Sequence, residues 1–98
     1  MTVTITVIFI YTYNMYFTYM LLTENNTYYC GYTDNVEKRF KAHLSGKGAK
    51  YTRANKPVKI VYQRAFQTKS EALKEERRIK KLSHYQKLEL ISAQNNCK

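Results

Sequence analysis

The chain has 98 residues, enough for one domain with a modest core and too few for a catalytic unit plus a separate targeting unit. Its 17 Lys and Arg residues against 7 Asp and Glu residues give a formal net charge of +10, so nucleic acid is the leading class of partner. Two cysteines and two histidines without ligand spacing argue against a zinc site or a disulfide framework and favour a reducing compartment.

Residues 1–23 carry no charged side chain, which raises the alternative of a membrane segment or a signal peptide. Threonines dilute the apolar character, and the segment has neither a basic start nor a small-residue cleavage motif. Residues 2–7 instead alternate threonine with apolar residues, a period-two pattern typical of a strand with one polar face. We therefore expect a strand-like or flexible extension over residues 1–15, with Met15 as an alternative start of the domain.

The next segment predicts a β-hairpin. Residues 17–22 and 27–33 are rich in β-branched and aromatic side chains, as strands are. Between them stand three polar residues that suit a tight turn, Glu24, Asn25 and Asn26.

A helix is predicted over residues 35–44. Asp34, followed three residues later by Glu37, forms a capping-box pattern, and a glycine follows the helix. The expected apolar stripe consists of Val36, Phe40 and Leu44. Arg39 and His43 lie one turn apart beside this stripe, so a positive group is expected close to the sheet.

A basic stretch follows the helix and leads into another strand. Residues 46–53 predict a loop with two glycines. Pro57 has no N–H to donate and therefore suits the first position of a strand that continues over residues 58–62.

The last third of the chain predicts two helices. Ser70 is expected to cap a helix over residues 71–82, and Ser83 with Gln86 forms a capping box for a helix over residues 84–92. Together the elements predict an α+β fold in which a small three-stranded antiparallel sheet is flanked by helices in the order ββαβαα.

Three side chains raise chemical questions. Glu76 shares a helix face with residues that pack inward, so it must be ion-paired, exposed at the margin or bound to a cation. A salt bridge to Lys80 or Arg39 is the structural alternative to a cation. Tyr19 and Tyr29 lie on the two hairpin strands, where cross-strand packing is the ordinary explanation for aromatic side chains.

The order and spacing of these features resemble the GIY-YIG nuclease family over about residues 16–91. The matching blocks are Phe17-Thr18-Tyr19 at the GIY position, Tyr29-Cys30-Gly31 at the YIG position, Arg39 in the first-helix motif and Glu76 at the metal-binding glutamate. The sequence is most similar to the small, stand-alone members found in bacteria and some large DNA viruses. It departs from larger members in having no asparagine between Glu76 and Asn95, where Lys80 or Lys87 is a candidate substitute.

This resemblance implies a metal-dependent endonuclease that hydrolyses DNA phosphodiester bonds, with one divalent ion, Mg or Mn, held by Glu76. Tyr19, supported by Tyr29, is expected to take the proton of the attacking water, its phenolate favoured by Arg39 or lysine charge. Arg39 is expected to stabilise charge on the phosphate. For His43, packing and a role in phosphate contact or proton handling both stay open. The alternative function is a non-catalytic nucleic-acid-binding protein with the same fold.

The resemblance and the basic charge also imply where DNA binds. The expected contacts to the DNA backbone are Lys47, Lys50, Tyr51, Arg53, Lys56 and Lys80, with a plain solvated face as the alternative for the basic stretch. We expect the catalytic domain to span residues 16–92, followed by a polar tail over residues 93–98. A monomer without a membrane role is expected in the cytoplasm, or in the nucleus for a virus of a eukaryotic host.

Overall fold

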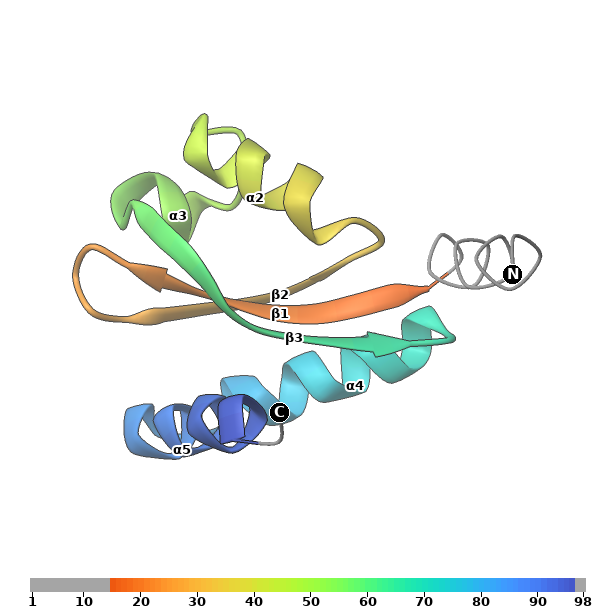
Figure 1. Cartoon of the computed structure of the whole chain (residues 1–98). Helices are drawn as coiled ribbons and strands as arrows, with labels where there is room; N and C mark the ends of the chain where they lie inside the picture. Colours follow the sequence, from red (N-terminus) through yellow and green to blue (C-terminus); the bar gives the residue numbers. More distant parts are fainter. Residues whose placement is uncertain (1–14, 97–98) are drawn as a thin grey trace, which may run out of the picture.

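The computed structural model describes residues 15–96, and these form a three-stranded antiparallel sheet with helices on both faces. The strands β1 (Tyr16–Thr23), β2 (Tyr28–Thr33) and β3 (Pro57–Phe66) lie in the order β2-β1-β3. The helices are α2 (Val36–Leu44), α3 (Lys50–Ala54), α4 (Lys69–Lys80) and α5 (His84–Asn96). Figure 1 shows α2 and α3 on one face of the sheet and α4 and α5 on the other. The predicted α+β class is confirmed.

The expected N-terminal extension lies outside the described residues, apart from Met15, which directly precedes β1. The uncharged segment after it, Tyr16–Thr23, forms the central strand of the sheet. No helix within residues 15–96 is long and apolar enough to cross a membrane.

The hairpin is confirmed, and its register places Tyr19 opposite Gly31 and Leu21 opposite Tyr29. Asn26 occupies the turn with a positive φ of 59°, a conformation that asparagine tolerates better than most residues. Because residues on one strand alternate between faces, Tyr19, Leu21 and Tyr29 point toward α2 and α3. Met20 and Cys30 point toward α4 and α5.

Two predicted helix caps are wrong, each by one or two residues. Asn35, not Asp34, caps α2: its backbone is extended and its side chain accepts a hydrogen bond of 3.1 Å from the Lys38 N–H. Thr68, not Ser70, caps α4 by accepting from the Glu71 N–H at 3.2 Å. In both cases the cap is the residue whose backbone is still extended before the first helical turn.

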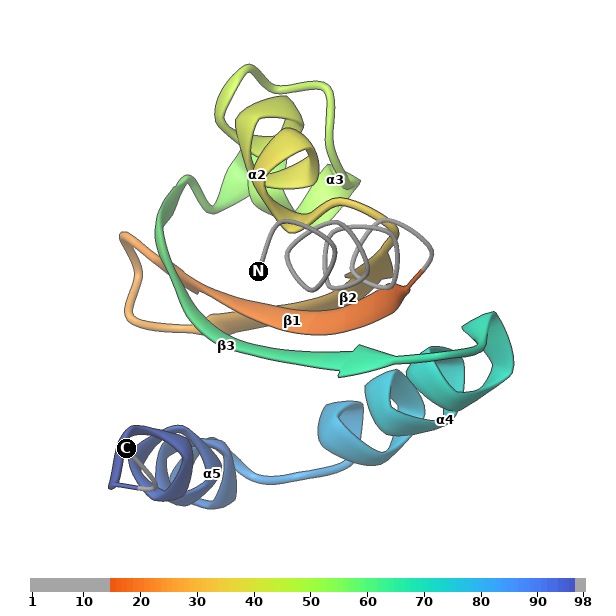
Figure 2. The same ribbon diagram turned by 45° about the vertical axis from the view of Figure 1, so that its right-hand side comes forward.

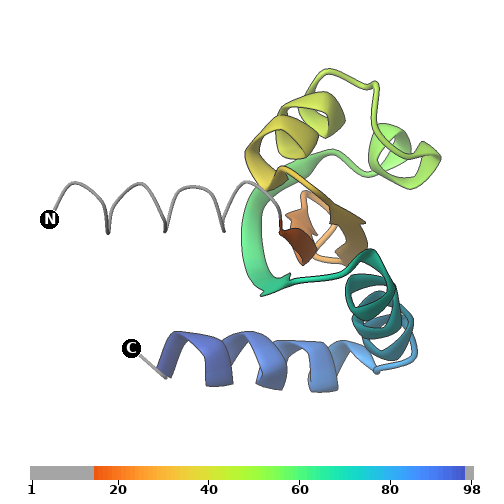
Figure 3. The ribbon, with the colours of Figure 1, turned by 90° about the vertical axis from the view of Figure 1, so that its right-hand side faces the viewer.

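The predicted capping box at the start of α5 is confirmed. The Ser83 N–H donates to the Gln86 side chain at 2.9 Å, and the Gln86 N–H donates to the Ser83 hydroxyl at 3.1 Å. The helix then continues to Asn96, past residue 92, where the sequence pattern predicts its end. Figure 3 shows α5 leaving the end of α4 in a new direction.

Two further elements differ from the sequence prediction. The predicted basic loop contains a short helix, α3, whose Asn55 N–H bonds to the Tyr51 carbonyl at 2.9 Å. Strand β3 begins at Pro57, as predicted, but runs on to Phe66 because it pairs with β1 along its whole length, from Thr23↔Pro57 to Tyr16↔Phe66. Sheet pairing thus extends the strand beyond its apolar stretch.

The sheet separates two hydrophobic clusters. Figure 2 shows the sheet between its two helical layers. The cluster on the α4 and α5 side consists of Met20, Cys30, Tyr62, Ile79 and Ile91. The cluster on the α2 side consists of Tyr19, Leu21 and Val36. Leu44, the expected end of the apolar stripe, is 44% exposed, and His43 is buried in its place. The last turn of α2 therefore turns a polar ring, not a leucine, toward the sheet.

Candidate active site

The centre of the site is a hydrogen bond between Tyr19 and His43. Tyr19 lies in the middle of the central strand, and His43 lies in the last turn of α2; each side chain is 1% exposed. The Tyr19 Oη atom and the His43 Nε2 atom are 2.8 Å apart. The structure thus brings together two of the predicted site residues from different elements.

Glycines make room for both partners. A Cβ atom on Gly31, which faces Tyr19 across the hairpin, would lie 2.8 Å from the Tyr19 hydroxyl oxygen. A Cβ atom on Gly48 would overlap the Nδ1 atom of His43. Both rings therefore reach their positions only because these two residues lack side chains. In the sequence, Gly31 could be noticed because it belongs to the triplet at the YIG position. Gly48 could not, because only its place in a predicted loop marked it.

Tyr29 and Tyr51 extend the cluster toward solvent. The Tyr29 ring meets His43 edge to face with centroids 5.0 Å apart, and its centroid lies 6.3 Å from that of Tyr19. Tyr51, predicted to contact DNA, stacks on Tyr29 at 6.1 Å and is 41% exposed. Its hydroxyl donates to the Thr27 hydroxyl at 2.7 Å, which ties α3 to the hairpin turn.

The far side of the His43 ring contacts a residue that sequence reasoning missed. The His43 Nδ1 atom lies 2.7 Å from the hydroxyl oxygen of Thr52, which is 2% exposed, and 3.4 Å from the Ala49 nitrogen. The Thr52 hydroxyl also lies 2.9 Å from the Ala49 carbonyl oxygen. Thr52 stands within a run of basic and small residues that predicts a solvated loop, so nothing in the sequence pointed to its burial.

Burial keeps Tyr19 and His43 uncharged at neutral pH. Desolvation raises the pKa of Tyr19 well above its ordinary value; Tyr29 adds to the rise, and Arg39 opposes it without cancelling it. Arg39 thus favours the Tyr19 phenolate, as expected, but desolvation outweighs this effect, so Tyr19 is a neutral phenol in the protein without substrate. Desolvation, followed by the Arg39 charge, lowers the pKa of His43 to about 4. Arg39 thus acts on both members of the pair.

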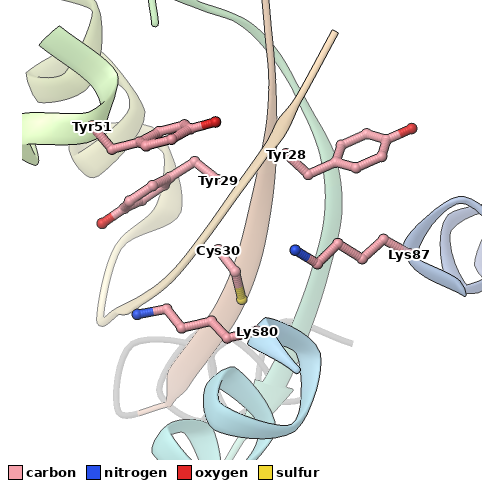
Figure 4. A pocket seen from close by; sticks show the side chains of 6 residues that line it. All are labelled: Tyr28, Tyr29, Cys30, Tyr51, Lys80 and Lys87. Carbon is pink, nitrogen blue, oxygen red and sulfur yellow. The ribbon is translucent and has the colours of Figure 1, made fainter. Parts of the chain in front are cut away.

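A groove crosses the outer edge of β2, beside this cluster. Its lining side chains are Tyr28, Tyr29, Cys30, Tyr51, Lys80 and Lys87. Figure 4 shows Tyr29 and Tyr51 on one side of β2 and Lys80 and Lys87 on the other. Burial, with the Glu76 charge as the next cause, raises the pKa of the Cys30 thiol to about 12, so this thiol stays protonated and is no nucleophile.

Glu76 forms an ion pair with Lys80, one of the two lysines that line this groove. Its side chain is 14% exposed, and its Oε1 atom lies 3.2 Å from the Lys80 Nζ atom, one turn further along α4. The ion pair to Lys80 that the sequence left open is therefore present. Within residues 15–96 there is no cluster of three or more His, Cys, Asp or Glu side chains that could enclose a metal ion. A carboxylate next to a lysine that lines the groove nevertheless fits Mg or Mn, because these ions keep several waters and take oxygen ligands from substrate phosphates.

The most deeply buried acid of α4 is its neighbour, Glu75, which the sequence pattern did not single out. Glu75 is 7% exposed, accepts a hydrogen bond from Tyr62 at 3.0 Å and is held by two nitrogens of Arg78 at 2.7 and 2.9 Å. Arg64 lies 3.6 Å away. The Arg78 hydrogen bonds lower the pKa of Glu75, so this carboxylate is ionised and fully partnered. Its role is structural.

The predicted backbone-contacting residues gather on and around α3. Lys47, Lys50, Arg53 and Lys56 are all exposed, and Lys50 and Arg53 belong to α3 itself. Lys80 approaches the same groove from the opposite side of the sheet. The arrangement leaves the proposed phosphate contacts free in solvent and close to the aromatic cluster.

A fold of this order, carrying paired tyrosines on a hairpin, an arginine on the next helix and a glutamate on a later one, matches one family. Residues 15–89 match the family described as the GIY-YIG catalytic domain, and the chain belongs to this nuclease superfamily.

Within that family, the chain belongs to the UPF0213 group. It is 44% identical over 85 residues to a UPF0213 protein of Bacillus velezensis, covering 87% of this chain and 86% of that protein. It is 51% identical over 72 residues to a UPF0213 protein of Cupriavidus necator, covering 74% and 78%. The solution NMR structure of a UPF0213 protein from Bacillus halodurans gives a TM-score of 0.53 at 42% identity, covering 81% and 84% of the two chains. A protein from E. faecalis gives 0.57 at 36% identity, covering 83% and 86%.

Proposed function

We propose that this protein is a metal-dependent endonuclease that hydrolyses DNA phosphodiester bonds. The observation that carries the proposal is the hydrogen bond of 2.8 Å between Tyr19 and His43, with Arg39 acting on both, beside a groove lined by Lys80, the ion-pair partner of Glu76. All these side chains come from one chain, so a monomer suffices. The catalytic unit is assigned to residues 16–92.

The tyrosine and the histidine act together on the attacking water. Because Tyr19 is a neutral phenol, it takes a proton from the water only if it releases its own proton at the same time. The His43 Nε2 atom, 2.8 Å away, accepts that proton. As the water oxygen bonds to phosphorus, the bond from phosphorus to the leaving ester oxygen breaks, and this oxygen takes up a proton from solvent. With a pKa of about 4, the His43 imidazolium then returns its proton to solvent.

Arg39 and Tyr29 complete the arrangement around the phosphate. The planar Arg39 guanidinium stabilises the negative charge that grows on the phosphate oxygens during attack. Tyr29, packed against His43 at 5.0 Å, fixes the plane of the imidazole and, together with Tyr51, excludes water from one side of it.

Glu76 would hold the divalent cation, with water and phosphate oxygens completing its ligands. When bound there, the cation supplies charge neutralisation at the leaving oxygen. Lys80, which pairs with Glu76 at 3.2 Å, is then free to turn toward the phosphate from the opposite side of the groove.

The test is cleavage of a mixed panel of single-stranded, duplex and branched DNA, with Mg, with Mn and with a chelator. We expect cleavage by the wild type only with metal, and a loss of about a hundredfold or more in Glu76→Ala. Glu75→Gln is the matched control, because it changes the neighbouring carboxylate without touching the groove. Equal rates for wild type and Glu76→Ala would remove the proposed metal ligand.

One observation favours a second candidate, a nucleic-acid-binding protein without turnover. Lys80 already neutralises Glu76, and the basic residues around α3 need no metal to bind phosphates. This candidate predicts metal-independent DNA binding and an intact panel after long incubation with Mg or Mn.

A further inference from the structure

We propose that Thr52 is a positioning residue that fixes His43 in the tautomer with the proton on Nδ1, leaving Nε2 free to accept the proton of Tyr19. This inference rests on the proposed function for its consequence in catalysis, whereas the tautomer itself is a property of the folded protein.

The first argument is the burial of Thr52. Helix α3 has five residues, and all of the others, Lys50, Tyr51, Arg53 and Ala54, are exposed. Thr52 alone is 2% exposed, and its hydroxyl is directed at the His43 ring. A buried hydroxyl needs partners, and the two that it has are His43 Nδ1 and the Ala49 carbonyl.

The second argument concerns which atom donates the proton in each hydrogen bond of the Thr52 hydroxyl. The Thr52 hydroxyl has one proton, and the Ala49 carbonyl oxygen, 2.9 Å away, can only accept it. The hydroxyl oxygen is then an acceptor toward His43, so the proton of the bond of 2.7 Å belongs to Nδ1. A neutral imidazole carries only one N–H, and Nε2 therefore faces the Tyr19 hydroxyl with its lone pair.

The other tautomer is less favourable in this geometry. If Thr52 donated to Nδ1, its oxygen and the Ala49 carbonyl oxygen would face each other at 2.9 Å without a proton between them. The proposed tautomer, by contrast, gives up only the hydrogen bond from the Ala49 N–H to Nδ1, which at 3.4 Å is the longest in the group. The backbone at Gly48 closes the remaining side of Nδ1, so Thr52 supplies the one good acceptor there.

The consequence is a directed hydrogen bond at the reacting end. With Nε2 as the acceptor, Tyr19 donates to His43 and keeps its own oxygen lone pairs free to accept a proton from the attacking water. With the reverse tautomer, Nε2–H would donate to Tyr19 and could accept nothing. Thr52 therefore acts on the water only through His43 and Tyr19.

The experiment is nitrogen NMR of the imidazole rings at neutral pH, where His43 is uncharged. The chain has only two histidines, so exposed His84 serves as an internal reference. We expect a protonated Nδ1 and an unprotonated Nε2 for His43 in the wild type and in Thr52→Ser, which keeps the hydroxyl. Thr52→Val, of similar shape, should shift His43 toward the opposite tautomer and slow cleavage about tenfold, the effect of losing one such hydrogen bond.

Thr18→Val is the matched control. It also removes a fully buried threonine hydroxyl, one that donates to the Ala72 carbonyl at 2.7 Å on the other face of the sheet. It should leave the His43 signals and the cleavage rate unchanged.

An unprotonated Nδ1 in the wild type overturns the inference, and this result needs neither a variant that folds nor an active enzyme. A tautomer change in Thr52→Val with an unchanged cleavage rate overturns its catalytic part. A wild type that shows the expected tautomer but cleaves nothing instead overturns the proposed function.

Discussion

At the residue scale, the two side chains at the centre of the candidate site are uncharged, although the proposed reaction requires a proton to pass between them. Tyr19 and His43 share a hydrogen bond in a dry environment, so neither is ionised before substrate arrives. Arg39 is the permanent positive charge that acts on both. In the proposed reaction, the pKa of Tyr19 therefore depends on the charges that the substrate and the cation would bring, and the folded chain supplies the geometry for proton transfer in advance.

Arg39→Ala is expected to lower the cleavage rate by about a hundredfold or more, because it removes the guanidinium N–H groups that donate hydrogen bonds to the phosphate. Since the Arg39 charge lowers the pKa of His43, the variant should also raise that pKa, which an NMR titration measures. Lys41→Ala, an exposed change on the same helix, is the control and should alter neither quantity. An unchanged rate in Arg39→Ala would exclude this arginine from the reaction.

Stability should fall in mild acid because of His43. Its pKa is about 4 in the folded chain against an ordinary value of 6.5, so the unfolded chain binds a proton first. The contribution is fully present above pH 6.5 and decreases as the pH falls toward 4, by about 2 kcal/mol between pH 6.5 and about pH 5. Urea unfolding at a series of pH values measures it.

His43→Gln should flatten this pH dependence, whereas His84→Gln should retain it, since His84 is exposed. Glu75 does not interfere in this range: its pKa lies below 4.5, so its contribution is lost only at lower pH. A wild-type slope identical to that of His43→Gln would show that His43 is not held neutral by the fold.

The sequence predicted the residues that form the candidate site but not the residues that hold them in place. Tyr19, Tyr29 and Arg39 could be predicted because their spacing follows a motif, and the His43 contact agrees with the proton-handling alternative. Thr52, Gly48 and Glu75 could not, because their roles arise from tertiary contacts with His43 and with Tyr62. A one-dimensional pattern carries no information on such contacts.

At the scale of elements, α5 protects one edge of the sheet. The Gln94 side chain donates to the Gln63 carbonyl at 2.8 Å and accepts from the Gln63 N–H at 3.4 Å. A side-chain amide thus pairs with the outer edge of β3 as a neighbouring strand would, which blocks pairing with another chain. This contact also explains why the helix continues past residue 92.

Gln94→Ala is expected to destabilise the fold by about 1 kcal/mol, the usual net effect of losing such hydrogen bonds. The Gln63 amide should exchange its hydrogen faster, which hydrogen-exchange NMR detects residue by residue. Asn95→Ala, an exposed change in the same turn, should leave that amide unchanged. Identical protection of Gln63 in Gln94→Ala and the wild type would contradict the role of the side chain.

Apart from α3, the element types were predictable, whereas the element ends were not. The hairpin and α4 follow from alternation and helical periodicity, which are local properties. The length of β3 depends on its partner strand, α3 on the contacts of Tyr51 and Thr52, and the end of α5 on Gln94. Each of these boundaries is set by tertiary contacts that local propensity does not encode.

At the scale of the whole molecule, a charge of +10 on 98 residues should make DNA binding strongly dependent on salt. Replacing Lys47, Lys50, Arg53 and Lys56 by glutamine should reduce the slope of log affinity against log salt by about 0.9 for each lost phosphate contact with duplex DNA. Arg64→Gln, which changes a residue paired with Glu75, is the control and should leave the slope unchanged. A wild-type affinity that hardly varies with salt would show that the basic residues do not contact phosphates.

The close approach of Tyr19 to Gly31 has an evolutionary consequence. A methyl group at position 31 would stand 2.8 Å from the tyrosine oxygen and 3.0 Å from the ring carbon that bears it. An alanine there would require position 19 to give up its hydroxyl, and with it the proposed reaction, and a phenylalanine would still leave its ring carbon 3.0 Å from the methyl group. The two triplets are therefore epistatic: descendants that keep the phenol must inherit the glycine, and only those with a smaller side chain at position 19 are free to change at both positions.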